Sequence, residues 1–424
     1  MTMKKGKNLL LLGALAAGLS ACGPQDSSTT NGSGSSKGSN KDYDLLVWED
    51  QSKSAGIKDA VKAFEEEHDV TIKVVEKAYA DQLEDLRLDG PAGTGADVIT
   101  IPGDQIGTAV TEGLLKEMDV DQATQDIYTE AAMQSQIVDS KVYGLPKAVE
   151  TQILYYNKAL ISEEELPETT DEWLTYSKKV TTDSSYGLLA LWDQIYYAQG
   201  VIGPYGGYVF GEDADGNYDP NDIGLANDGA IEGAAYIKEF YDSGVFPTGI
   251  IGEQGINVLD SLFTEGKAAA VISGPWNLEP YKEAGIDYGV KELPMLGNNK
   301  HMGSFIGVKS YNVSSYSQNA DLAEEFVEFI TNEENSKVRF EKTAEIPAVE
   351  ALASDSSILK SESAAAIAEQ SKYAELTPGI TAMNSVWEPI DSALQTIATG
   401  KAEPETALPQ AVEQIKSAIA ATQN

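Results

Sequence analysis

Residues that could perform acid–base or metal chemistry are present in this sequence, but their spacing matches no catalytic pattern. The two histidines, His68 and His301, lie far apart, and neither has the spacing of a metal ligand. The chain contains no G-x-S-x-G turn, no P-loop and no G-x-G-x-x-G motif after a strand. The chain has 67 acidic residues, so the presence of a pair of carboxylates does not indicate catalysis. We therefore expect a protein that is not an enzyme and that uses no cofactor.

The stretch FGEDADGNYDP, residues 210–220, comes closest to a calcium-binding loop. Such a loop needs glycine at its sixth position and glutamate at its twelfth. Gly216 follows Asp213 by only three residues, and position twelve counted from Asp213 is not a glutamate. A solvent-facing hairpin with an Asp-Gly turn is the better prediction, and we expect no metal there.

Cys22 is the only cysteine, and it stands directly behind a short apolar segment. Three lysines precede the apolar residues 9–21, a run too short to span a bilayer of about 30 Å. The sequence Leu-Ser-Ala-Cys at 19–22 resembles the lipobox of bacterial lipoproteins, whose cysteine carries a diacylglycerol. This resemblance predicts a signal peptide over 1–21, a lipid anchor at Cys22 and a location on the outer face of the cell membrane. The alternative is an ordinary signal peptide with a chance cysteine.

The composition after Cys22 predicts a tether followed by a large folded part. Residues 22–41 are rich in glycine, serine and polar side chains, which favours a flexible linker. The remainder is long enough for two domains. The formal net charge of the whole chain is −37, and such a negative surface repels nucleic acid and does not attract anionic lipid. We expect a monomer with a neutral or cationic ligand, although the charge could equally serve solubility alone.

From Tyr43 onward the hydrophobic pattern alternates between strand and helix. Ile57, Val61 and Phe64 fall on one helical face, and Leu408 begins an apolar stripe in the mostly helical C-terminal third. Such alternation predicts parallel sheets covered by helices. The ranges concerned are strands at 43–49, 70–77, 96–104, 151–157 and 267–274, and helices at 54–69, 80–88, 170–180 and 227–242.

Four blocks, in this order, resemble one known family. They are YGLPKAVETQILYYNKALI (143–161), the Gly-Gly-Tyr region 203–230, LFTEGKAAAVISGPW (262–276) and the late helix pair 326–349. The chain is similar to the maltose/maltodextrin-binding branch of the bacterial extracellular solute-binding proteins, the receptors of ABC importers.

This resemblance implies an α/β fold of two lobes, each a mainly parallel sheet flanked by helices, with the ligand cleft at the hinge. The chain would cross between the lobes near 148–150, 303–305 and 349–354. Closure of the lobes would be the binding event. The implied N-terminal lobe comprises 42–149 and 305–350, and the C-terminal lobe comprises 150–304 and 351–424.

The resemblance also implies binding residues that suit a sugar. Aromatic rings cover the apolar face of a pyranose, while charged or amide groups bind its hydroxyls. Trp48 and Trp173 match no family position and are predicted to be packing residues. The residues matched to the family are Trp276, Trp387 and Tyr196 for stacking, Asp104 and Glu150 for hydroxyls, and Lys53 of the first lobe.

The sequence departs from the family at cleft positions. Gln105 stands where members often have the arginine of a tryptophan–aspartate–arginine cluster, and Gln194 replaces a matched glutamate. Asp391 aligns with a cleft arginine, which reverses the charge. We expect Trp192 and Asp193 to compensate from the same loop, so Trp192, Gln105 and Gln194 join the predicted ligand-binding set.

The leading functional hypothesis is a membrane-anchored receptor that delivers maltodextrins, neutral α-glucans, to ABC importer permease subunits. A receptor for cyclodextrins or a raffinose-type sugar is the alternative within the family. A tethered glycoside hydrolase is the runner-up from another class, and a purely structural surface protein is a third hypothesis.

Overall fold

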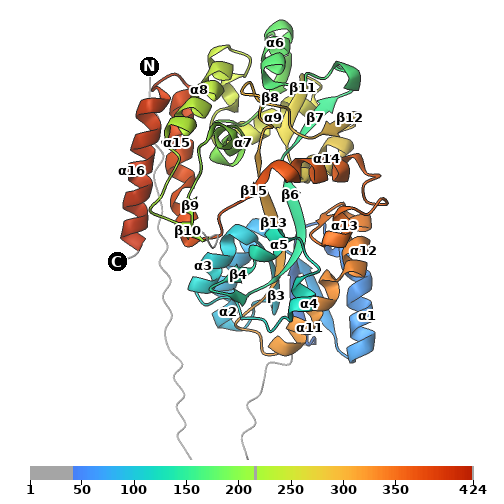
Figure 1. Ribbon diagram of the computed structural model, residues 1–424. Helices are drawn as coiled ribbons and strands as arrows, with labels where there is room; N and C mark the ends of the chain where they lie inside the picture. The colour runs from blue at the N-terminus through green and yellow to red at the C-terminus, as the bar shows by residue number, and fades with distance from the viewer. Residues whose placement is uncertain (1–41, 214–216, 423–424) are drawn as a thin grey trace, which may run out of the picture. The chain divides into compact units, whose positions relative to one another are not determined.

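Two β-sheets, each covered by helices, organise the folded part of the chain (Figure 1). The computed structural model describes residues 42–213 and 217–422. We call the seven-stranded sheet with the helices on it the N-lobe, and the four-stranded sheet with its helices the C-lobe. The predicted signal peptide 1–21, the tether 22–41 and the anchor Cys22 lie outside the described residues.

The N-lobe sheet has the order β14-β6-β13-β3-β1-β2, and β15 pairs with the start of β13. β1 runs parallel to β2 and β3, whereas β13 runs antiparallel to β3 and β6. The strands are β1 (Leu45–Glu49), β2 (Ile72–Glu76), β3 (Val98–Pro102), β6 (Leu145–Thr151), β13 (Ser304–Val313), β14 (Ile346–Pro347) and β15 (Ala374–Leu376).

All five residues of β1 are buried because helices cover both faces of the sheet. Alternate side chains of a strand point to opposite faces. Leu45 and Val47 therefore join the core that contains Phe64, whereas Leu46 and Trp48 join a separate core. The helices are α1 (Lys58–His68), α11 (Ala320–Thr331) and α12 (Glu333–Thr343) with the first core, α2 (Gln82–Ala92) and α3 (Ile106–Thr111) with the second, and the short α4 (Gln122–Gln125), α5 (Glu130–Gln134) and α13 (Glu350–Ala353).

The C-lobe sheet has the order β12-β7-β11-β8. β11 is parallel to β8 and antiparallel to β7. Figure 1 shows the two C-terminal helices, α15 and α16, lying beside α8. The strands are β7 (Ile153–Asn157), β8 (Tyr186–Leu189), β11 (Ala268–Ser273) and β12 (Tyr288–Lys291), and the helices are α6 (Thr170–Val180), α7 (Ile195–Tyr205), α8 (Asp228–Asp242), α9 (Gly255–Thr264), α10 (Leu278–Glu283), α14 (Glu362–Gln370), α15 (Trp387–Ala398) and α16 (Pro404–Thr422).

The α/β class is confirmed, but the expectation of mainly parallel sheets needs correction. Both sheets are mixed: in the N-lobe β13 lies between β3 and β6 and is antiparallel to each, and in the C-lobe β7 is antiparallel to β11 and β12. A parallel pair needs a long crossover connection, usually a helix, and β13 instead reaches the N-lobe from the C-lobe. The apolar stripe of the last helix is confirmed, since Leu408, Val412 and Ile415 are buried.

The chain passes between the two sheets at short segments. Gln152 alone separates β6 of the N-lobe from β7 of the C-lobe. The return from β12 to β13 occupies residues 292–303, and residues 354–361 lead from α13 to α14. These segments lie close to the predicted crossings. The lobe boundaries given above remain a proposal, and they assign to the C-lobe two parts of the N-lobe sheet, namely β15 and the end of β6.

The aspartate-rich stretch forms a short hairpin. β9 (Gly211–Glu212) pairs antiparallel with β10 (Tyr218–Asp219), as predicted. The Asp-Gly turn itself, residues 214–216, lies outside the described residues. The described residues contain no group of three or more His, Cys, Asp or Glu side chains that could hold a metal ion.

Candidate functional site

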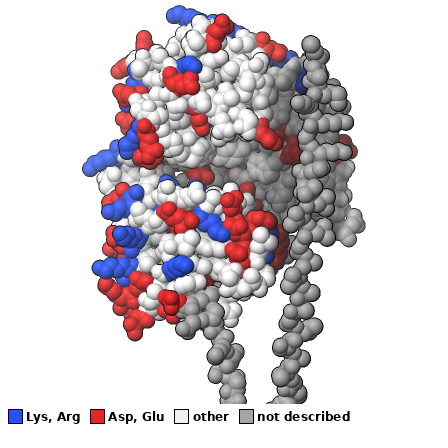
Figure 2. Space-filling view, turned by 180° about the vertical axis from the view of Figure 1, so that it is seen from behind, with Lys and Arg blue, Asp and Glu red and all other residues white. Residues whose placement is uncertain are grey.

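A cavity of about 370 Å³ lies where the two lobes meet. Its N-lobe wall comes from β6, β13 and the turn after β3, and its C-lobe wall comes from α7, α9, α15 and the turn after β11. Figure 2 shows the surface hollowed between the C-lobe above and the N-lobe below. The lining residues are Tyr79, Pro102, Asp104, Glu150, Tyr196, Tyr197, Ile256, Trp276, Gly307, Val308, Thr377 and Trp387.

A chain of aromatic rings runs along the cavity. The ring centroid of Tyr196 lies 6.3 Å from that of Trp276 and 6.2 Å from that of Phe305. Phe305 in turn lies 6.4 Å from Trp387. Phe305 is buried at the start of β13, where the chain re-enters the N-lobe. Phe305 is therefore a buried support at the hinge for Tyr196 and Trp387, and Tyr196 in turn contacts Trp276.

The Gly-Pro-Trp motif places Trp276 at the end of a buried strand. β11 ends at Ser273, and residues Pro275–Asn277 form a turn of 3-10 helix. A side chain at Gly274 would clash, because its Cβ would lie 2.1 Å from the Trp276 ring. The Tyr155 hydroxyl donates a hydrogen bond of 2.7 Å to the Gly274 carbonyl oxygen. The motif is thus a structural requirement for the position of this ring.

Two carboxylates of the N-lobe face the same cavity. Asp104 lies in the 3-10 turn Gly103–Gln105, and Glu150 lies near the end of β6. Burial raises the pKa of the Asp104 carboxyl, and repulsion by Glu150 adds to the rise. Paired acceptors beside aromatic rings form the polar and apolar halves of a site for a hydroxyl-rich, ring-shaped ligand.

Lys309 supplies the positive charge of this wall. Its ammonium lies 3.3 Å from Glu150 and 3.6 Å from Asp50, and it stands 4.6 Å above the ring centre of Tyr79. Burial alone would lower the pKa of Lys309, but attraction by Glu150, Glu345 and Asp50 outweighs it, so the pKa lies above its ordinary value. A cation–π contact and two ion pairs therefore fix this wall.

A fully buried ion network anchors β6 beneath the cavity. The Lys147 ammonium contacts the carboxylate of Glu49 and lies 3.2 Å from that of Glu345. The Tyr311 hydroxyl donates to Glu49, and Arg339 donates to the Lys147 carbonyl oxygen at 2.8 Å. Because Lys147 and Glu150 share one strand, the network fixes the backbone that carries the Glu150 carboxylate.

The structure brings together five of the nine predicted binding residues. Three others lie outside the set of described residues that line the cavity. Lys53 donates to the Thr343 carbonyl oxygen at 3.1 Å, Gln105 follows Asp104 in the same turn, and Gln194 is the N-cap residue of α7. The five residues at the cavity are Asp104, Glu150, Tyr196, Trp276 and Trp387.

Trp192 requires a correction. Its side chain is fully buried and packs edge-on against Phe240, with the ring centroids 4.8 Å apart, and against Phe246. The ring therefore belongs to the C-lobe core and cannot stack on a ligand in the cleft. Asp193, which was also expected to compensate for the changed cleft residues, is buried as well and accepts a 2.7 Å hydrogen bond from the Gly252 amide. Trp48 and Trp173 are packing residues, as predicted.

Four polar or aromatic residues that line or support the cavity were missed by sequence analysis. Tyr79, Tyr197 and Thr377 line the cavity, and Lys309 pairs with its carboxylate. One signal was available for Tyr197, because it adjoins the predicted Tyr196. Lys309 is a lysine inside the apolar strand β13, a position where a charge requires a partner.

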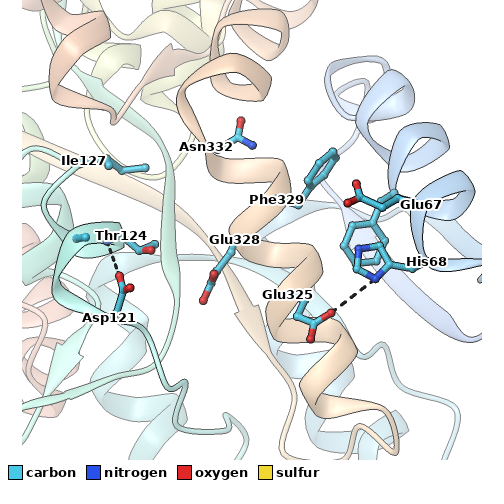
Figure 3. A pocket seen from close by; sticks show the side chains of 11 residues that line it. Glu67, His68, Asp121, Thr124, Ile127, Glu325, Glu328, Phe329 and Asn332 are labelled. Carbon is cyan, nitrogen blue, oxygen red and sulfur yellow. Dashed lines mark hydrogen bonds and ion pairs between the residues drawn. The ribbon is translucent and has the colours of Figure 1, made fainter.

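A second cavity, of about 600 Å³, lies on the N-lobe between α1, α4 and α11 (Figure 3). Four carboxylates and His68 surround a floor that includes Phe64 and Phe329. His68 stacks on Phe64 with the centroids 4.0 Å apart and lies 3.7 Å from a Glu325 oxygen. The residues of only one lobe build this cavity, so lobe closure would not enclose a ligand there. The four carboxylates are Glu67, Asp121, Glu325 and Glu328.

Over the part of the chain that the structure describes, no helix is both long and apolar enough to cross a bilayer.

Comparisons with known proteins agree on one family. The model of the family described as bacterial extracellular solute-binding protein matches residues 59–367. A galactooligosaccharide-binding protein of Bacillus subtilis is 61% identical over 418 residues, which cover 99% of this chain and 98% of that protein. The maltodextrin-binding protein MdxE of the same organism is 36% identical over 428 residues, 98% of each chain.

A solved structure extends the comparison to three dimensions. The crystal structure of a cyclo/maltodextrin-binding protein complexed with maltotetraose superimposes with a TM-score of 0.81 at 36% sequence identity. The superposition covers 90% of this chain and 99% of that one.

Proposed function

Because this chain belongs to the bacterial extracellular solute-binding proteins, we propose that it captures an oligosaccharide in the cleft between its lobes and delivers it to an ABC importer. The family is one of binding proteins, so the chain is not an enzyme, and the glycoside-hydrolase hypothesis is set aside. The observation that carries the proposal is the cavity where Tyr196, Trp276 and Trp387 face Asp104 and Glu150.

The composition of this cavity suits a sugar chain. Aromatic faces bury the C–H surface of pyranose rings, and carboxylates accept paired hydrogen bonds from neighbouring hydroxyls. Lys309 balances the charge of Glu150, so the wall can hold an uncharged ligand without a counter-ion. In our proposal Asp104 and Glu150 bind hydroxyls and the three rings stack, while Lys53, Gln105 and Gln194 support this set from outside the cavity.

A galacto-oligosaccharide is the ligand class that we favour. The relative named for galactooligosaccharides is 61% identical to this chain, whereas the relative named for maltodextrin is 36% identical. The hypothesis of a maltodextrin receptor stays as the second candidate, because the similar solved structure holds maltotetraose. Galactose and glucose differ in the orientation of one hydroxyl. A site that hydrogen-bonds this hydroxyl in one sugar leaves a polar group without a partner when the other sugar binds, and this loss would discriminate between the two ligand classes.

We further propose that Cys22 carries a lipid that holds the receptor on the outer face of the membrane. Support comes from the lipobox-like residues 19–22 and from the extracellular family. The strongly acidic chain, at −37, would remain in solution above the membrane as a monomer on its tether. Metabolic labelling with a radioactive fatty acid tests the anchor: label should enter the wild type but not Cys22→Ala, and equal labelling of both would contradict it.

Calorimetric titration of the purified protein tests the ligand. Galactotetraose, maltotetraose, cellotetraose and raffinose are the four probes. One-to-one binding of galactotetraose, at least tenfold tighter than that of maltotetraose, is the expected result. Tighter binding of maltotetraose would restore the maltodextrin hypothesis, and heat from none of the four would contradict the proposed ligand class.

A further inference from the structure

Two helices of the C-lobe begin at the cavity, and each carries an aromatic ring of its wall in its first turn. Tyr196 is the second residue of α7, and Trp387 is the first residue of α15. The positions of these helix starts therefore set the separation of two rings that line the cavity.

Asp391 joins the two helix starts. It lies one turn after Trp387 on α15, and its Oδ1 accepts a hydrogen bond of 2.7 Å from the backbone amide of Ile195, the first residue of α7. The first amides of a helix lack acceptors within the helix and need a cap. Gln194 holds the N-cap position of α7, but the acceptor for Ile195 comes from α15. The cap thus bridges two helices instead of staying local.

The next peptide of α7 is held from the opposite side. The side-chain amide of Gln152 donates a hydrogen bond of 2.6 Å to the Tyr196 carbonyl oxygen. Gln152 is buried in the segment where the chain passes from β6 to β7. Asp391 and Gln152 therefore fix the backbone of Tyr196 between α15 and the hinge.

The surroundings of Asp391 contain a second carboxylate but little other charge. Burial raises the pKa of Asp391 to about 6, and repulsion by Asp193 contributes. Asp193 itself accepts from the Gly252 amide and from the Tyr241 hydroxyl of α8. The sequences of α7 and of the 3-10 turn Thr381–Ser385 contain no Asp, Glu, Lys, Arg or His.

The charged residues of the other helices packed on α15 either pair with groups other than Asp391 or are exposed to solvent. Lys238 of α8 pairs with Asp242 at 2.6 Å and lies 3.9 Å from Glu403. The remaining charged side chains of α8, α16 and α15 are exposed. They are Asp228, Glu232 and Glu239 of α8, Glu405, Glu413 and Lys416 of α16, and Glu388 of α15. The partial positive charge at the start of α7 is thus the electrostatic partner of the Asp391 carboxylate.

We propose that Asp391 is a positioning residue of the sugar cleft, because its hydrogen bond to Ile195 fixes Tyr196 relative to Trp387. The proposal rests on the proposed function for its effect on binding. A hydrogen bond to a carboxylate is about twice as strong as one to a neutral group. As the pH falls through about 6, Asp391 becomes neutral, the cap weakens and affinity for the oligosaccharide falls.

Calorimetric titration with galactotetraose at pH 7.5 and pH 5.0 tests the effect on binding. Asp391→Ala should weaken binding about tenfold at pH 7.5, because the Ile195 amide loses its acceptor. Asp391→Asn keeps an acceptor oxygen without a titrating charge, so it should recover most of that loss. Glu388→Ala, an exposed acid on the same helix, is the matched control and should bind as the wild type does.

The pH comparison isolates Asp391 from the other carboxylates of the cleft. Asp104 also titrates with a raised pKa, and its contribution is common to the wild type and to Asp391→Asn. The wild type should lose about threefold more affinity between pH 7.5 and pH 5.0 than Asp391→Asn does. Equal losses in the two proteins, or an affinity of Asp391→Ala equal to that of the wild type, would overturn the proposal.

Hydrogen exchange of the Ile195 amide, measured without ligand, keeps this proposal separate from the proposed function. Protection should fall in Asp391→Ala and persist in Asp391→Asn and Glu388→Ala. If the wild type binds none of the sugars, the proposed function fails while this measurement still decides the positioning role. Unchanged protection of Ile195 in Asp391→Ala would overturn that role.

Discussion

The ammonium of Lys309 lies 3.3 Å from the carboxylate of Glu150, and this pair forms the polar wall of the cleft. Both side chains are mostly buried, with 13% and 22% of their surfaces exposed. Because the same ammonium also faces Asp50 and the ring of Tyr79, one lysine organises three groups on separate elements.

Replacing this lysine should damage both stability and binding. Lys309→Met leaves the carboxylates of Glu150 and Asp50 without their shared cation, which should cost about 2 kcal/mol of unfolding free energy and weaken galactotetraose binding roughly tenfold. Lys291→Met is the control. It removes a surface ion pair in which the Lys291 ammonium lies 2.7 Å from Glu163, so it should change the unfolding free energy and the affinity little. Urea unfolding and calorimetry measure both effects, and equal behaviour of the two variants would contradict the assigned role.

Trp276 and Trp192 should give opposite results when replaced. Trp276→Ala removes a ring at the cavity, so galactotetraose binding should weaken roughly 10- to 100-fold with little change in stability. Trp192→Phe reduces a fully buried core ring, so it should lower the unfolding free energy by about 1 to 2 kcal/mol and leave the affinity unchanged. Unaltered affinity of Trp276→Ala would remove this tryptophan from the site.

The buried network around Lys147 predicts a pH-dependent stability. Burial alone would raise the pKa of Glu345, but attraction by Lys147 and Lys309 outweighs it, so the pKa lies below its ordinary value. A depressed pKa contributes stability above the unfolded-state pKa of about 4.5, and this stability is lost as the pH falls through the folded-state value.

Lys147→Met tests this account, since it leaves buried carboxylates without their cation. The variant should lose about 3 to 5 kcal/mol of unfolding free energy at pH 7. The difference from the wild type should shrink toward pH 4, because protonation of Glu345 then removes the buried charge. Urea unfolding at the two pH values measures it, and a difference that grows in acid would contradict the network.

The acidic cavity of the N-lobe offers a stabilising substitution (Figure 3). Burial raises the pKa of Glu328, and repulsion by Glu324, Asp121, Glu325 and Asp119 adds to the rise. Its ionised form is therefore unfavourable in the folded protein at neutral pH. Glu328→Gln should increase the unfolding free energy by about 0.5 kcal/mol in low salt and by less in 0.5 M salt, because exposed charges are screened. A decrease in both buffers would contradict this reading.

The elements could be predicted from local patterns, but the direction of strands could not. The apolar run of β1 and the apolar stripe on α16 both correspond to buried residues, so both elements were found from the sequence. The mixed N-lobe sheet depends on where β13 inserts, and β13 lies far along the chain from its neighbours β3 and β6. A hydrophobic pattern carries no information about such a distant partner.

The site was predictable only as far as motifs fix geometry. Gly274 leaves room for the ring of Trp276, so the Gly-Pro-Trp motif marks that ring reliably. Trp192 also follows an apolar strand, yet its ring packs against Phe240 in the core. Lys309 and Asp391 act on partners distant in sequence, Glu150 and Ile195, and these pairings emerge only from the fold.

The crystal structure of the protein grown with galactotetraose tests the central claim most directly. The account predicts sugar rings stacked on Trp276 and Trp387, with hydroxyls bonded to Asp104 and Glu150 and the two lobes closed around them. Sugar bound in the acidic cavity of the N-lobe, or anywhere outside the cleft, would contradict it.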